Sequence, residues 1–76
     1  MENLTLTCDT QNKDVIIDII LKYTSTSFCV LKSVSVLGNK TKILMSGCSQ
    51  HDIKNLKDIE MEESDYFSLL SNLQFN

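Results

Sequence analysis

The feature that most constrains how this chain folds is the pair Gly38-Asn39, which lies between two stretches of strand-like sequence. Residues 28–36 begin as a continuous apolar run and then alternate valine with serine, and residues 41–48 are again rich in apolar side chains. A glycine-asparagine pair accepts the positive φ angles of a tight turn. The sequence therefore predicts that the two stretches pair as an antiparallel hairpin. Lys32 interrupts the alternation, which predicts a bulge at that position.

Two further elements are predicted before the hairpin. Residues 4–8 alternate apolar side chains with threonine, the pattern of a short strand with one buried face. Residues 13–23 gather isoleucines on one broad helical face, and Asn12 precedes them as the expected N-cap. The opposite face carries polar residues at the i,i+4 spacing of ion pairs: Asp14, Asp18 and Lys22.

The stretch after the hairpin predicts helices. Ser49 followed three residues later by Asp52 has capping-box spacing, which predicts a helix over residues 50–58. Residues 59–62 alternate apolar and acidic side chains, so they form either the end of that helix or a short fourth strand. An apolar stripe after Ser64 predicts a short C-terminal helix that packs on the body.

The order of these elements predicts an α+β fold in one domain spanning residues 1–76. We expect an antiparallel sheet of three to four strands, with two main helices on one face in the split βαβ order of ferredoxin-like folds and a short C-terminal helix. A chain this small buries only roughly 60% of its unfolded surface, so a second copy or a partner would add useful burial. A homo-oligomer is therefore one expectation.

Composition narrows the function classes. The chain has no arginine, so it lacks the residue best suited to reading phosphates and bases, and nucleic-acid binding is disfavoured. Lysines near the predicted turn more often keep a sheet edge soluble than bind RNA: Lys32, Lys40 and Lys42. Three cysteines without paired spacing, Glu2 at the amino terminus and no membrane-spanning run predict reduced thiols, no membrane contact and a cytoplasmic location.

Cys48 and His51 are the candidate reactive pair. A thiol placed just before a helix start would be activated by the amide groups and dipole of that helix, and an imidazole nearby could assist it. The pattern lacks a third orienting residue, and buried cysteine is common, so catalysis is an alternative interpretation rather than the first. A metal site that adds Cys8 or Cys29 to the pair is weaker still, because only two ligands are specified. We expect no cofactor and no metal.

The acidic residues are strongly segregated. From position 58 to the end the chain holds five acids and no base, whereas the remainder holds five acids against seven lysines. A local anionic surface attracts cationic partners. The expected partner-binding residues are four of these acids and the tyrosine beside them: Glu60, Glu62, Glu63, Asp65 and Tyr66.

These observations favour a small non-enzymatic protein-binding module, an inhibitor or adaptor that occupies a basic surface of a larger protein. Carriage by a phage or mobile element would suit such a protein. Two alternatives stay open: a thiol-dependent enzyme or redox protein that uses Cys48 with His51, and a homo-oligomeric structural module.

Overall fold

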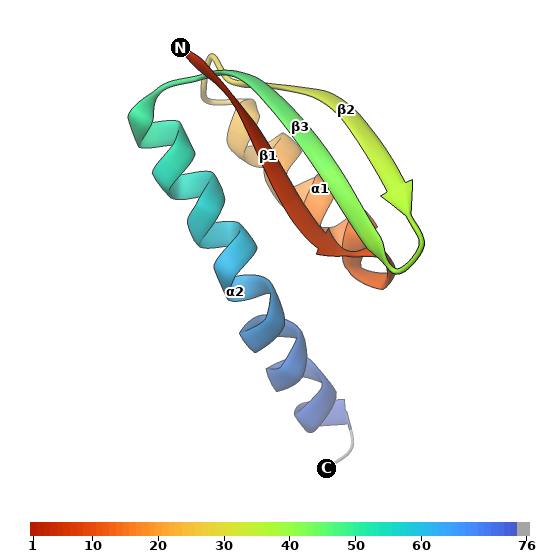
Figure 1. Ribbon diagram of the computed structural model, residues 1–76. Coiled ribbons are helices and arrows are strands. Elements are labelled where there is room, and N and C mark those ends of the chain that lie inside the picture. The colour runs from red at the N-terminus through yellow and green to blue at the C-terminus, as the bar shows by residue number, and fades with distance from the viewer. Residues whose placement is uncertain (75–76) are drawn as a thin grey trace.

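The computed structural model describes the backbone of residues 1–74 and the side chains of residues 1–62. Strand β1 and helix α1 are joined by a short 3-10 helix, the strands β2 and β3 follow, and helix α2 completes the described chain (Figure 1). The bounds are Glu2–Asp9 for β1, Thr10–Asn12 for the 3-10 helix, Lys13–Thr24 for α1, Val30–Leu37 for β2, Lys40–Cys48 for β3 and Gln50–Gln74 for α2.

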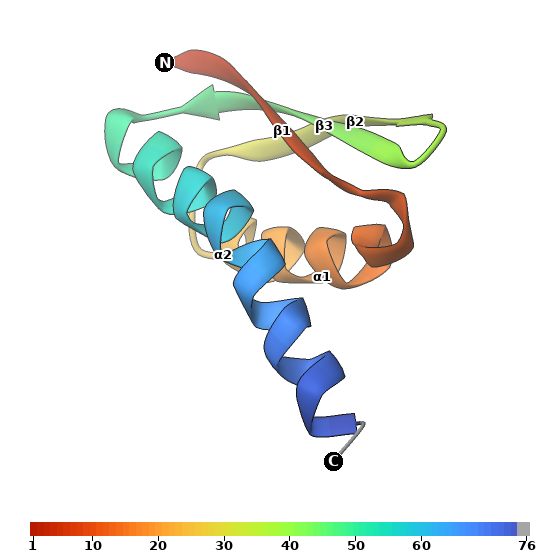
Figure 2. The same cartoon turned by 60° about the horizontal axis from the view of Figure 1, so that its bottom comes forward.

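The three strands form one antiparallel sheet in the order β1-β3-β2, so β3 is central and the other two are edges. Figure 2 shows both helices below the same face of the sheet. The α+β class, the first helix and the hairpin are confirmed. Asn12 is the N-cap residue of α1 as expected, but it is also the last residue of the 3-10 helix, and its side chain makes no capping hydrogen bond.

The hairpin turn has the geometry that its sequence predicts. Leu37 faces Lys40 across the turn, and Gly38 has φ +64° while Asn39 stays negative, the combination found in type II′ turns. The register between β2 and β3 shifts between Leu31 and Ser33, which leaves Lys32 as the extra residue of a bulge. The predicted bulge is confirmed.

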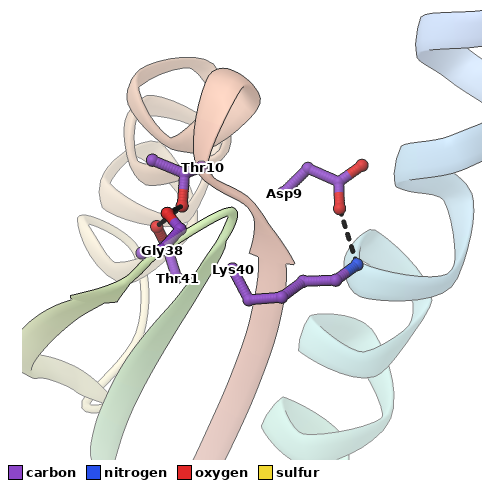
Figure 3. Close-up of polar contacts among 5 residues, drawn as sticks. All are labelled: Asp9, Thr10, Gly38, Lys40 and Thr41. Carbon is purple, nitrogen blue, oxygen red and sulfur yellow. Dashed lines mark hydrogen bonds and ion pairs between the residues drawn. The ribbon is translucent and has the colours of Figure 1, made fainter.

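Contacts at the end of β1 fix the turn in place (Figure 3). The Thr10 hydroxyl donates to the Gly38 carbonyl at 2.9 Å and lies 3.0 Å from the hydroxyl of the buried Thr41. The Thr10 amide donates to the Asn39 carbonyl, and the Lys40 ammonium pairs with Asp9 at 2.6 Å. The turn is therefore held by residues that lie about thirty positions earlier in the chain.

The core lies between the sheet and the helices. Alternate residues of β1 and β3 point into it, which explains the alternation seen in the sequence, and α1 and α2 close it from below. Its buried aliphatic members are Leu4, Leu6, Ile16, Ile20, Ile43, Met45 and Leu56. Strand β2 contributes little to the core, because seven of its eight residues are exposed and only Leu31 is half-buried.

The prediction for residues 59–62 resolves to helix. Ile53, Leu56 and Ile59 follow helical spacing and all pack on the core, so α2 continues past the point where a strand was the alternative. A fourth strand is not found among the described residues. Residues after Ser64 belong to the same helix as Gln50 in the structure, so a separate C-terminal helix is not confirmed.

The turn glycine generates the first testable prediction. Gly38→Ala should lower the free energy of unfolding by about 1–2 kcal/mol, because an L-residue pays that cost at positive φ. No atom lies within 4 Å of the added Cβ, so strain and not a clash would be measured. Thermal unfolding should shift down by roughly 4–8 °C per kcal/mol. Asn39→Ala is the matched control, and equal losses in both variants would contradict the assignment.

Candidate functional site

The acids of α2 do not form one uniform surface. Asp58 and Glu62 are exposed, whereas Glu60 is half-buried and its carboxylate accepts a hydrogen bond of 2.7 Å from the Thr7 amide of β1. Glu60 therefore binds its own chain, across fifty-three positions. The side chains of Glu63, Asp65 and Tyr66 lie outside the described part of the structure, so only Glu60 and Glu62 of the expected contact residues are placed.

The printed sequence holds the signal for the Glu60 contact, although sequence reasoning did not use it. Ile53 and Leu56 begin an apolar stripe that Ile59 continues. At 100° per residue, Glu60 falls between Ile53 and Leu56 on this same face, so its side chain turns toward the body and can meet an unpaired amide at a sheet edge.

Three ion pairs occur between described side chains, and none of them includes an acid of α2. They join Lys13 to Asp14, Lys22 to Asp18 and Lys40 to Asp9. Within the described residues, Asp58, Glu60 and Glu62 are thus not in an ion pair with a lysine. Asp58 and Glu62 are i,i+4 neighbours on the helix, where like charges repel.

Cys48 and His51 are not brought together. Cys48 is 1% exposed, and its Sγ lies 2.7 Å from the Sγ of Cys29, which is fully buried. His51 is exposed, and its Nε2 lies 3.1 Å from the Asn55 side-chain nitrogen one helical turn away. Burial, followed by the neighbouring Cys48 thiol, raises the pKa of Cys29 to about 12.

Sequence reasoning missed the Cys29 and Cys48 pair, yet the hairpin carries a signal for it. A two-residue turn at Gly38-Asn39 places position 29 directly opposite position 48, and the bulge at Lys32 shifts this by only one residue. Beyond the bulge Val30 lies opposite Ser46, so position 29 comes level with Gly47, next to Cys48, and the two thiols are close enough to meet.

Asp52 organises a polar network below the end of the sheet. Its Oδ1 accepts hydrogen bonds from the Tyr23 hydroxyl at 2.8 Å and from the Ser27 hydroxyl at 3.3 Å, and its Oδ2 accepts one from the Ser49 amide. The Asp52 amide in turn donates to the Ser49 hydroxyl, so the predicted capping box is confirmed. The bond from Tyr23, helped by the Ser49 amide, lowers the pKa of the Asp52 carboxyl.

A shallow hollow of about 340 Å³ lies over this network, with Tyr23, Ser27, Phe28, His51 and Asn55 along its wall. The Asp52 oxygens at its base are engaged by neighbouring donors, and Asn55 donates to the Tyr23 hydroxyl at 3.1 Å. The network thus joins α1, the loop before β2 and the start of α2. Its polar groups serve the fold and leave the hollow with few directed contacts for a ligand.

Exposed aliphatic side chains of β2 lie on both faces of the sheet. Val30, Val34, Val36 and Leu37 are all more than one third exposed, and Val30 and Leu37 are on the face away from the helices, opposite Ser46 and Lys40. Val34 and Val36 lie opposite the buried Ile43 and Thr41, so they belong to the face that the helices cover elsewhere. Helix α1 approaches β2 but leaves these two valines more than one third exposed.

The chain matches no protein-family model, no curated protein and no solved structure. Over the part of the chain that the structure describes, neither helix has an apolar stretch long enough to cross a bilayer. Among the same residues, no three His, Cys, Asp or Glu side chains converge as metal ligands.

The cysteine pair generates a prediction. Glutathione disulfide should convert the Cys29 and Cys48 thiols into an intramolecular disulfide and release two molecules of reduced glutathione. Formation should be slow, because the raised pKa of Cys29 keeps it protonated and the thiolate is the attacking species. The closed loop should raise the free energy of unfolding by roughly 3 kcal/mol.

The readout for this disulfide is alkylation in denaturant followed by mass spectrometry. Of the three cysteines, only Cys8 should be labelled after oxidation, with a mass lower by two hydrogens. Cys29→Ser should abolish the mass loss. Three labelled cysteines, or a disulfide between two chains, would contradict the prediction.

The Asp52 network predicts a pH dependence of stability. A carboxyl whose pKa is lower in the folded state than in the unfolded state stabilises the fold above its unfolded pKa, and this stability is lost as the pH falls through the folded pKa. Asp52→Asn should therefore melt at a lower temperature than the parent near pH 7, and the gap should narrow in acid. Melting curves from about pH 7 to about pH 2 measure this. Asp58→Asn, exposed on the same helix, is the control, and a pH-independent gap for Asp52→Asn would contradict the mechanism.

Proposed function

We propose that the protein is a small non-enzymatic binding module, an inhibitor or adaptor, that occupies a basic surface of a larger protein through the acids of α2. The observation that carries the proposal is the pair Asp58 and Glu62, two like charges one helical turn apart, exposed and without a lysine partner among the described residues. Such a pair by itself costs a few tenths of a kcal/mol in an isolated helix, and Lys54, four residues before Asp58, forms no ion pair with it. A cationic partner would relieve that repulsion.

The geometry supports a division of labour among the acids. Glu60 anchors α2 to the edge of β1 through the Thr7 amide, and this fixes the direction in which the rest of the helix leaves the sheet. The proposed contact is then formed by Glu62, Glu63, Asp65 and Tyr66, together with the exposed Asp58 one turn before Glu62. Glu60 acts on the partner indirectly, through the position of the helix.

A partner that fits this surface presents clustered lysines or arginines, as do proteins that bind nucleic acid or acidic peptides. Complementary charge mainly accelerates the encounter and selects against wrong partners. Binding should therefore weaken as salt rises, because exposed charges are screened beyond about 8 Å at physiological ionic strength.

The sheet order supports a finer proposal about the fold. The succession β1-α1-β2-β3-α2 with β3 between β1 and β2 is that of a ferredoxin-like split βαβ unit without its fourth strand. A fourth strand would lie beside β1. In this protein, Glu60 reaches that edge and binds the Thr7 amide there.

Self-association is the second candidate, and the exposed aliphatic side chains of β2 favour it. It involves the opposite edge of the sheet from α2 (Figure 1), so the two modes of binding do not compete for the same residues. The thiol-dependent enzyme stays a prediction. Cys48 is buried against Cys29, and the His51 ring contacts Asn55, so neither residue is placed in a way that favours it.

Charge reversal tests the proposed contact. Immobilised Glu62→Lys/Glu63→Lys protein should capture its partner from the native host at least about tenfold less than the parent, because each repulsive contact costs on the order of 1 kcal/mol. The matched control is Asp14→Lys/Asp18→Lys on α1, which changes the net charge equally and removes only exposed ion pairs of small value. Its capture should match the parent.

Glu60→Gln separates anchoring from contact. The melting temperature should fall, because a neutral amide oxygen is a weaker acceptor for the Thr7 amide than a carboxylate. At temperatures where the variant is folded, partner capture should fall less than in the Glu62/Glu63 double variant. Equal capture by the Glu62/Glu63 variant and the parent would overturn the proposal, as would equal loss in both charge reversals.

A further inference from the structure

Strand β2 is an open edge of the sheet. One hydrogen bond on the other edge shows which of its backbone amides and carbonyls point outward. The Thr7 amide donates to Glu60, so the backbone groups of Thr7 point away from β3. In an antiparallel pair the direction alternates, so Leu6 and Cys8 bond to their partners on β3, Ile43 and Thr41. The backbone groups of Ile43 and Thr41 therefore face β1.

The same alternation assigns the other side of β3. Because Ile43 and Thr41 bond toward β1, the residues opposite them on β2 cannot bond to them and turn their amides and carbonyls outward. Those residues are Val34 and Val36. The edge of β2 thus offers a row of donors and acceptors directly beside two valine side chains that are 38% and 51% exposed.

Helix α1 extends this apolar surface. Tyr23 reaches α2 through its hydroxyl, so it marks the flank of α1 that faces α2. At 100° per residue, Ile17 and Leu21 lie on the other side of the buried stripe of Ile16 and Ile20, toward β2. Leu21 is 50% exposed, and it adds to the valines an apolar surface that the chain leaves uncovered.

The devices that normally protect such an edge are missing from its middle. Edge strands are kept from pairing by charges, prolines or bulges. The chain has no proline, and the only charge and the only bulge of β2 coincide at Lys32, near its start. The five residues from Ser33 to Leu37 are uncharged and follow the regular register.

We propose that β2 pairs antiparallel with β2 of a second copy, so that two sheets join into one continuous sheet across a twofold axis near Ser35. Val34 then exchanges backbone hydrogen bonds with Val36 of the second copy, and Val36 with its Val34. Valine side chains meet on the helix side of the joined sheet. On the other side the two Ser35 residues meet, and Leu37 lies opposite Ser33 of the second copy. Leu21 of each copy borders the valine cluster.

Self-pairing fits the charges of the edge. A twofold interface brings the same surface against itself, so a charge near its centre would face its own copy. Antiparallel pairing about Ser35 places the two Lys32 residues toward opposite ends, roughly 20 Å apart and beyond the Debye length. Helix α2, which carries the segregated acids, lies on the β1 side of each sheet, away from the junction (Figure 1).

The paired length limits the strength of the dimer. With the axis near Ser35, the five residues from Ser33 to Leu37 pair in each copy, a stretch of about 17 Å. We therefore expect an interface smaller than the standard one of roughly 800 Å² per partner, and a dimer that forms reversibly.

Sedimentation velocity of the full chain tests the proposal, from about 1 to about 500 µM. We expect a reversible dimer that persists in about 1 M NaCl, because apolar contacts and backbone hydrogen bonds are not screened. A monomer at every concentration would overturn the proposal. Dissociation of the dimer by salt would also overturn it, since charged contacts would then hold the copies together.

A proline pair identifies the edge. Val36→Pro removes an outward amide that β3 does not use, so the monomer should stay folded while dimerisation weakens at least about a hundredfold. Thr5→Pro removes the equivalent outward amide on β1 and should leave the dimer intact. Circular dichroism checks the fold of both variants, and Val36→Lys against Thr5→Lys repeats the comparison through side chains should either proline variant unfold. Loss of the dimer in the β1 variants, or its survival in both β2 variants, would overturn the proposal.

Discussion

Every layer of this protein depends on the pairing of β3 with both of its neighbours. The backbone groups of β3 are divided between β1 and β2, and its inward side chains Thr41, Ile43 and Met45 are fully buried beneath that pairing. A strand satisfied on both sides is the only one that can carry the centre of a small core, because unpaired buried amides are costly. The turn at Gly38, held by Thr10, sets the register from which this division follows.

A central strand implies two edges, and the chain treats them differently. At β1 the Glu60 carboxylate meets an outward amide, and α2 lies along that side of the sheet. At β2 only the bulge at Lys32 departs from a regular, uncharged strand. Both edges expose a row of backbone donors and acceptors. At β1 the chain itself supplies a partner for one of them, whereas at β2 the row stays open beside an apolar surface.

The sequence carried most of the fold and little of the candidate sites. Local patterns were sufficient where the decisive interaction is itself local: the Gly38 turn, the Ser49 and Asp52 capping box and the alternation of β1. Residues 59–62 could not be assigned locally, because their period fits a strand and only the packing of Ile59 on the core favours the helix. The Cys29 and Cys48 contact and the Glu60 bond to Thr7 join residues far apart in sequence, so they depend on the assembled fold.

The same reasoning explains why an acid count could not identify a contact surface. Ten acids are spread over the chain, yet Asp52 stabilises the start of α2, Glu60 binds β1 and three others pair with lysines. What distinguishes Asp58 and Glu62 is that the fold leaves their mutual repulsion uncompensated within the described residues. Pairing through β2 would place these acids at the two outer ends of a joined sheet. A partner with two basic surfaces at a matching separation would then bind both copies at once, and the second contact would form at the high effective concentration that linkage provides.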